Sequence, residues 1–218
     1  MTDDPAAAVL AGGPGQADDR LRAALRGVRL IVAADAGMEL AEALGVRPDL
    51  WVGDFDSVSA PLLERHRDVP MLEHPKDKDE LDLELAIAAA RQRGATRLVL
   101  GGVFDGRLDQ TLAALLIAAR LREEGVGARL YGGEHEAHVL AAGDALPLAL
   151  PRGTLFSLLS LRGLARVDVK GARFPLEAAE LPFGVGLGLS NRATDGPTVT
   201  VRDGTVAVII EWGEEATA

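Results

Sequence analysis

Residues 28–57 read VRLIVAADAGMELAEALGVRPDLWVGDFDS, and this stretch decides the fold class. Apolar runs at residues 28–35 and 49–56 are typical of strands, and the sequence MELAEALG between them is typical of a short helix ending at Gly45. A strand, a helix and a second strand in this order predict a right-handed crossover between parallel strands. Both predicted strands end in aspartate, at Asp35 and at Asp54 with Asp56.

The same alternation continues on both sides of this stretch. We expect further strands at residues 6–13, 97–103 and 128–133, and helices at residues 21–25, 82–93 and 108–124. Strands that alternate with helices predict a mostly parallel sheet flanked by helices. The fold class is therefore α/β for the N-terminal part, which we place at residues 1–143.

The sequence changes character after about Asp144. Long helical patterns stop, and short alternating runs such as TLFSLLSL and TVAVIIEW are separated by glycine. This pattern predicts a small antiparallel β-sandwich at residues 144–218. Asp203 and Gly204 stand between two alternating runs and predict a hairpin there.

Composition narrows the possible functions. The 218 residues carry a formal net charge of -10, which argues against a partner that is a nucleic acid polymer. Without cysteine, the chain has no disulfide and no thiolate metal site. The N-terminus is acidic where a signal peptide would be basic, and no apolar run is long enough for a membrane span. We therefore expect a soluble, cytoplasmic protein that binds no membrane.

Ligands of parallel α/β sheets bind beyond the carboxyl ends of the strands, and the acidic residues fall there. Asp54 and Asp56 can converge on one cation, and Mg²⁺ is typically held by one or two carboxylates together with substrate phosphates. A turn or a helix cap would use the same residue types, and for Asp54 and Asp56 alone the two interpretations are evenly balanced.

A second acidic cluster covers residues 74–82, HPKDKDELD. One helix cap needs one acid, whereas this segment has Asp77, Asp79, Glu80 and Asp82 beside two lysines. Mixed charges suit a loop that holds both metal ions and phosphate oxygens. A solvated helix N-terminus is the alternative interpretation.

A third segment is GGVFDGRLDQ at residues 101–110. Its glycines would let backbone amides approach an anion, and Arg107 offers a planar fork for a phosphate or a base edge. Asp109 could cap the following helix or bind a ligand. Gly12 and Gly13 form neither a P-loop nor a dinucleotide motif, so they either line a nucleotide or only turn the chain.

Together these segments resemble the thiamine pyrophosphokinase family. The resemblance rests on ADAG at 34–37, RPDLWVGDFDS at 47–57, DKDELDLELAI at 77–87, GGVFDGRLDQTLA at 101–113 and GLSN at 188–191. It implies a catalytic nucleotide-binding domain, a β-sandwich domain for thiamine binding and dimerisation, and a homodimer. It also implies transfer of a pyrophosphoryl group from ATP to the hydroxyl of thiamine with Mg²⁺, which gives thiamine diphosphate and AMP.

The resemblance assigns roles to individual residues. It implies Mg²⁺ ligands at Asp54, Asp56 and Asp82 and a supporting acid at Asp79. It implies thiamine binding by Asp35, Ser190 and Asn191. The residues predicted to bind the nucleotide are Gly12, Gly13, Gly37, Lys78, Gly106, Arg107 and Gln110. The residues predicted to act in catalysis are Asp35, Asp54, Asp56, Asp79, Asp82, Arg107 and Asp109, with the base left open between Asp35 and Asp109.

The chain departs from the family pattern at several positions. Leu81 stands where threonine is common, Arg192 where bacterial members often have glutamate, and Gln110 where histidine is frequent. Two alternatives therefore stay open. One is a related pyrophosphokinase that acts on another heteroaromatic alcohol such as a hydroxymethylpterin, and the other is a non-catalytic nucleotide-binding protein. We expect His135–His138 to lie in a surface loop, Trp51 in the core, and Trp212 either in the core or stacked on thiamine.

Overall fold

The computed structural model describes residues 7–56, 58–77, 79–104 and 107–213. The chain forms two compact units. Unit 1 extends to Ile117 and resumes at Val126–Gly133, and unit 2 consists of Ala118–Gly125 and the chain from Glu134 onward. No helix in the described part of the chain is long and apolar enough to cross a membrane.

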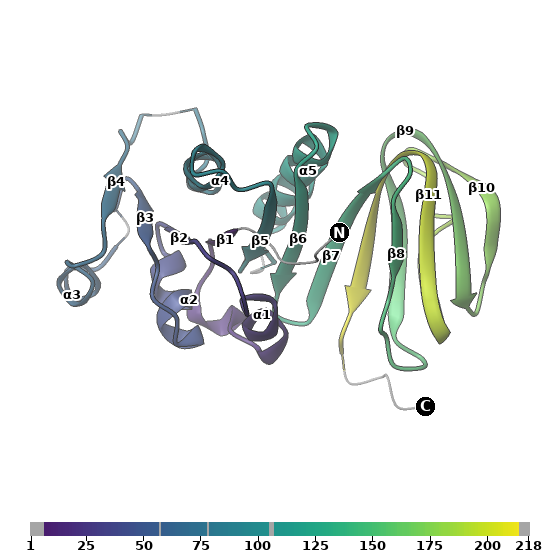
Figure 1. The fold of residues 1–218 in the computed structure, drawn as a ribbon, viewed down its shortest axis with the longest axis horizontal. Coiled ribbons are helices and arrows are strands. Elements are labelled where there is room, and N and C mark those ends of the chain that lie inside the picture. Colours follow the sequence, from purple (N-terminus) through teal and green to yellow (C-terminus); the bar gives the residue numbers. More distant parts are fainter. Residues whose placement is uncertain (1–6, 57, 78, 105–106, 214–218) are drawn as a thin grey trace. The chain divides into compact units, whose positions relative to one another are not determined.

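Unit 1 contains a parallel sheet with the strand order β6-β5-β1-β2-β3-β4 (Figure 1). The strands are β1 (Ala7–Leu10), β2 (Ile31–Ala34), β3 (Leu50–Gly53), β4 (Met71–Glu73), β5 (Arg97–Gly101) and β6 (Gly127–Gly132). The helices are η1 (Pro14–Gln16), α1 (Asp19–Ala24), α2 (Gly37–Leu44), α3 (Ala60–Arg65), α4 (Asp82–Gln92) and α5 (Leu108–Glu123). This arrangement confirms the predicted α/β fold class.

Alternation along the buried strands divides their side chains between two faces. Leu10 of β1, Ala33 of β2 and Trp51 of β3 share one core cluster with buried residues of α1, α2 and α3. Helix α4 packs on β1, β2 and β3 through a side that includes the buried residues Ala86, Ile87 and Ala90. All four residues of β1 are buried, as expected for a central parallel strand.

Unit 2 is antiparallel throughout its described strands. These are β7 (His135–Ala141), β8 (Ala145–Pro147), β9 (Leu155–Ala172), β10 (Leu176–Pro182) and β11 (Asn191–Glu211). Phe156 of β9 pairs with both Asn191 and Ile210 of β11, so the two long strands curl around a shared core. This architecture agrees with the antiparallel C-terminal part predicted from the sequence.

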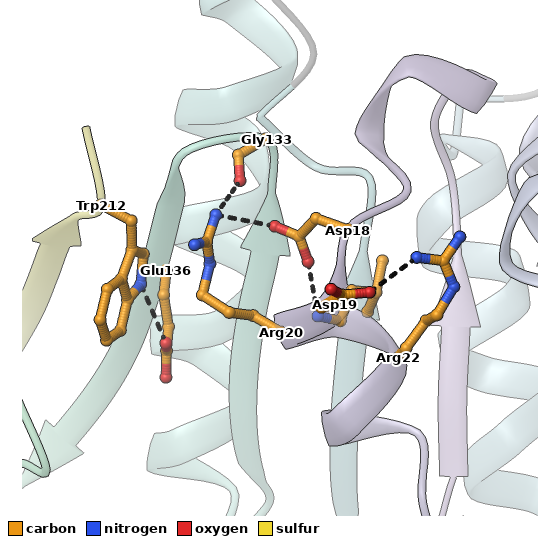
Figure 2. A network of polar contacts seen from close by, with 8 residues as sticks. Asp18, Asp19, Arg20, Arg22, Gly133, Glu136 and Trp212 are labelled. Carbon is orange, nitrogen blue, oxygen red and sulfur yellow. Dashed lines mark hydrogen bonds and ion pairs between the residues drawn. The ribbon is translucent and has the colours of Figure 1, made fainter. Parts of the chain in front are cut away.

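Backbone geometry confirms the predicted end of a helix at Gly45 and shows further caps in unit 1. Gly45 follows α2 with a φ of 71°, and Gly94 follows α4 with a φ of 88°, the left-handed conformation that ends many helices. At the start of α1, Asp18 accepts a hydrogen bond from the Leu21 amide at 2.7 Å. Figure 2 shows Arg20 bonding to both the Asp18 carboxylate and the Gly133 carbonyl, each at 2.9 Å.

Two local predictions are wrong. Asp203 and Gly204 do not form a hairpin, because β11 runs through them with shifts in its register to β9, and Gly204 has a φ of 82°. The glycine serves a bulge in one long strand. His135–His138 lies in β7 and not in a surface loop, and only 9% of His138 is exposed.

Candidate functional site

A cavity of about 220 Å³ lies at the carboxyl ends of the strands of unit 1. Three strand ends contribute to it: Ala11–Gly13 after β1, Asp35 after β2, and Gly102 after β5. Helices α4 and α5 complete the lining. The full lining is Ala11, Gly12, Gly13, Ala34, Asp35, Ala36, Leu81, Asp82, Leu83, Gly102, Val103, Gln110 and Ala114. The structure thus brings together five of the predicted site residues, Gly12, Gly13, Asp35, Asp82 and Gln110.

Glycines let the backbone segments at this cavity approach each other closely. A Cβ on Gly12 would overlap the Gly102 carbonyl, and a Cβ on Gly37 would overlap the Leu10 carbonyl. Packing therefore explains Gly12 and Gly37 without a ligand. Gly13 differs, because a Cβ there would have no heavy atom within 4 Å outside its chain neighbours.

Asp35 is held in an unusual conformation at the edge of the cavity. Its φ is 45°, in the left-handed region that few residues other than glycine adopt. Its amide donates to the Val52 carbonyl at 2.8 Å, and its own carbonyl accepts a hydrogen bond from Nε1 of Trp51 at 2.8 Å. A Cβ on Gly53 would lie 3.0 Å from Oδ1 of Asp35, so the glycine leaves room for this carboxylate.

Asp54 and Asp56 lie on the next loop, after β3, and are not among the residues that line the cavity. The Asp56 amide donates to Oδ1 of Asp54 at 3.2 Å. The Asp56 carboxylate pairs with Nζ of Lys76 at 2.9 Å, and Asp79 is exposed. Within the described ranges no three acidic or histidine side chains are arranged to hold a metal ion. The set Asp54, Asp56 and Asp82 stays a prediction.

Two helices begin at the cavity with apolar N-cap residues, which cannot cap the helix with their side chains. Ala36 precedes α2 and Leu81 precedes α4. The Leu81 amide is bonded back to Oε2 of Glu84 at 3.3 Å. Helix N-termini carry partial positive charge and amide donors, so this edge of the sheet suits an anion such as a phosphate.

Arg107 and Asp109 lie at the start of α5 and are both exposed. The guanidinium donates to both carboxylate oxygens, at 2.6 and 3.2 Å. This hydrogen bonding lowers the pKa of Asp109 below its ordinary value, so the carboxyl group is a weak proton acceptor in this arrangement. Lys78 and Gly106, both predicted to contact the nucleotide, lie outside the described residues.

The predicted thiamine-binding pair belongs to unit 2. Ser190 has a φ of 57°, and its amide donates to Oγ of Ser157 at 3.1 Å. Asn191 is only 4% exposed, and its amide group bonds to the backbone N–H and C=O of Phe174 at 3.0 and 2.7 Å. Arg192 donates to the Gly153 carbonyl at 2.9 Å. Asn191 therefore shapes the loop before β10.

Unit 2 also holds a partly buried polar group, whose contacts the sequence did not predict. Glu136 of β7 bonds to Nε2 of His138 at 2.7 Å and accepts a hydrogen bond from Nε1 of Trp212 at 3.3 Å. Figure 2 shows the Trp212 indole directed toward the Glu136 carboxylate. Trp212 packs against the core of unit 2, which is the structural one of its two predicted roles.

Structural comparison finds this fold in known proteins. The chain is similar to the structure of thiamine pyrophosphokinase from Bacillus subtilis, with a TM-score of 0.81, 20% identity, and coverage of 94% of this chain and 98% of that one. For thiamin pyrophosphokinase from Geobacillus thermodenitrificans the TM-score is 0.80 at 20% identity, over 97% and 99% of the two chains. For thiamin pyrophosphokinase from Candida albicans the TM-score is 0.76 at 15% identity, over 94% and 89%. At these identities the likeness establishes the fold.

Sequence comparison establishes the family. Residues 21–130 match the thiamin pyrophosphokinase catalytic domain, and this match covers half of the chain. No curated protein matches the sequence. The chain belongs to the thiamin pyrophosphokinase family.

Proposed function

We propose that this protein is a thiamine diphosphokinase, which transfers a pyrophosphoryl group from ATP to the hydroxyl of thiamine and releases AMP. The observation that carries the proposal is the cavity at the strand ends, in a chain of this family. The cavity combines two carboxylates, Asp35 and Asp82, with two helix N-termini. A site of this composition suits a polyphosphate that arrives with cations.

The donor set fits Mg²⁺, because carboxylate oxygens are the ligands that this ion prefers. Asp82 lines the cavity, and Asp54 and Asp56 lie on the neighbouring strand end. We assign Asp54, Asp56 and Asp82 as the residues that would hold the ion, with Asp79 in support. The bound ion would neutralise charge on the phosphate oxygens. The described residues that line the cavity include no lysine or arginine and so do not supply this positive charge themselves.

The protein's own groups then perform the remaining tasks. Amides at the starts of α2 and α4 would bind phosphate oxygens, and Arg107 would hold a phosphate or the adenine end of ATP. Asp35 lines the cavity and could accept the proton of the acceptor hydroxyl there, whereas Asp109 is already paired with Arg107. Asp35 is therefore the better candidate for the base.

The cavity is smaller than the roughly 300–1,000 Å³ of most small-molecule sites, so ATP and thiamine would extend beyond it.

We propose that Ser190 and Asn191 shape the thiamine site and that the protein is a homodimer. A dimer would cover exposed apolar side chains on unit 2. They are Leu164, Phe174, Phe183, Val185, Leu187 and Leu189. The lack of cysteine is compatible with a cytoplasmic location.

The test measures AMP released from ATP and Mg²⁺, with and without thiamine, and detects thiamine diphosphate by fluorescence after oxidation. Thiamine-dependent AMP in equal amount to thiamine diphosphate supports the proposal. If ATP binds but thiamine gives no product, the acceptor assignment is wrong. A screen of pterin-like alcohols would then separate a related pyrophosphokinase from a protein without catalysis.

A further inference from the structure

Two residues in the loops that carry the candidate acids have strained backbones. Asp35 has a φ of 45°, and Phe55, between Asp54 and Asp56, has a φ of 59°. For residues other than glycine such conformations are unfavourable and persist only where the surroundings enforce them. The structure must therefore contain groups that hold both turns.

One buried side chain contacts both turns. Nε1 of Trp51 donates to the Asp35 carbonyl at 2.8 Å, and the Trp51 ring meets the Phe55 ring edge to face, with centroids 5.2 Å apart and planes at 87°. Trp51 is completely buried in β3. Its ring also meets the His66 ring at 6.2 Å and 88°, so the indole is fixed on a further side.

The Trp51 side chain fills the core and also donates a specific hydrogen bond. A buried N–H needs an acceptor, and the Asp35 carbonyl is the one that the indole uses. The same carbonyl is also 3.4 Å from the Met38 amide, a longer contact at the start of α2. Leucine or phenylalanine could fill much of the same space but would leave the Asp35 turn without its shorter hydrogen bond.

We propose that Trp51 is a positioning residue that sets the directions of the Asp35 carboxylate and of the Asp54–Asp56 loop together. The proposal rests on the proposed function for its catalytic consequence. The coupling of the two acidic turns through one indole does not depend on which reaction the protein catalyses. Loosening the indole should disturb the two loops at the same time, although Asp35 and Asp56 follow different strands.

The test replaces Trp51 by phenylalanine and, in a second protein, by 3-benzothienylalanine. The second side chain keeps both rings and replaces the N–H by sulfur, so the core stays filled. Trp212→Phe is the matched control in unit 2. Amide hydrogen exchange is measured residue by residue by NMR at Asp35 and Asp56, with the Ala8 amide, bonded to the Leu30 carbonyl at 2.8 Å, as an internal reference.

We expect both replacements to speed exchange at Asp35 about three- to tenfold, as for the loss of one hydrogen bond, and to speed it at Asp56 as well, while Ala8 stays unchanged. In the kinase assay kcat should fall while KM for ATP and thiamine changes little. Unchanged exchange at Asp35 and Asp56 in the benzothienyl protein overturns the positioning role. A wild-type protein without thiamine kinase activity would overturn the proposed function. The exchange measurement would still decide whether Trp51 positions the two loops.

Discussion

Nζ of Lys76 lies 2.9 Å from Oδ2 of Asp56, and this ion pair joins the loop after β4 to the loop after β3. Both partners are well exposed, so the pair adds at most about 1 kcal/mol to stability. Its importance is electrostatic. A divalent cation bound by Asp56 would lie close to the ammonium group and be repelled by it.

We therefore expect Lys76→Met to increase the affinity for Mn²⁺ several-fold, with little change in thermal stability. Mn²⁺ binding is followed by electron paramagnetic resonance. Arg67→Met, which breaks the exposed pair with Glu64, is the control. An unchanged affinity in Lys76→Met would argue that Asp56 is not a ligand.

Asp54→Asn should abolish turnover and change the free energy of unfolding by less than about 1 kcal/mol. The asparagine oxygen can still accept the hydrogen bond from the Asp56 amide, whereas the charge for a cation is lost. AMP release and thermal unfolding check the two parts. An unfolded variant would make Asp54 a structural residue and remove it from the metal site.

Leu81→Thr should stabilise the protein by about 0.5–1 kcal/mol, because threonine can cap α4 and leucine cannot. Leu81 is 43% exposed, so its replacement leaves little core unfilled. Chemical denaturation measures the gain. Leu72→Thr, at a residue 37% exposed on the edge strand β4, is a control that creates no cap, and equal effects of the two changes would contradict the explanation.

Gly12→Ala should destabilise unit 1 by about 1–3 kcal/mol or more, since the new methyl group would overlap the Gly102 carbonyl. Gly13→Ala places its methyl group in open space and should be close to neutral for stability. Comparing the two by thermal unfolding separates the packing role from general glycine effects. Similar losses in both variants would refute the packing explanation.

Acid sensitivity should depend on Glu42 of α2. Its carboxylate accepts a hydrogen bond from Arg65, which, aided by His66, lowers the pKa of Glu42 from 4.5 to about 2. A lowered pKa in the folded protein gives stability that is present above pH 4.5 and is lost as the pH falls toward 2. The Glu42→Gln variant should therefore be less stable than wild type above pH 4.5, and this difference in the free energy of unfolding should shrink as the pH falls toward 2. Denaturation at several pH values measures it, and a pH-independent deficit would contradict the assignment.

Local sequence signals predicted the elements whose determinants are themselves local. Helices α2 and α4 end at glycines with positive φ, as their sequences indicate. Strand β4 was missed because its three residues are exposed at the sheet edge and show no alternation. The turn chemistry of Asp203–Gly204 fits both a hairpin and a bulge, and only pairing with the distant β9 decides between them.

The candidate site was predictable to the extent that strand ends define it. Asp35 was found from its place at a strand end and Asp82 from the acidic cluster before a helix, and both line the cavity. Small apolar lining residues such as Ala11 and Ala114 gave no signal, because alanine is common throughout the chain. The contacts of Trp51 with Asp35 and of Lys76 with Asp56 depend on which strands become neighbours, which no local pattern contains.

The order of the strands along the chain also determines the order in which they can pair during synthesis. The described strands of unit 1 have all been made once Gly133 is added, so its parallel sheet can form early. Strand β7 follows at once, but its partner residues 205–211 are made only after strands β8, β9 and β10. Until then the edge of β7 that later pairs with β11 lacks this partner, so it can associate wrongly with other nascent chains. A chaperone that covers nascent segments would be most useful to this protein during that interval.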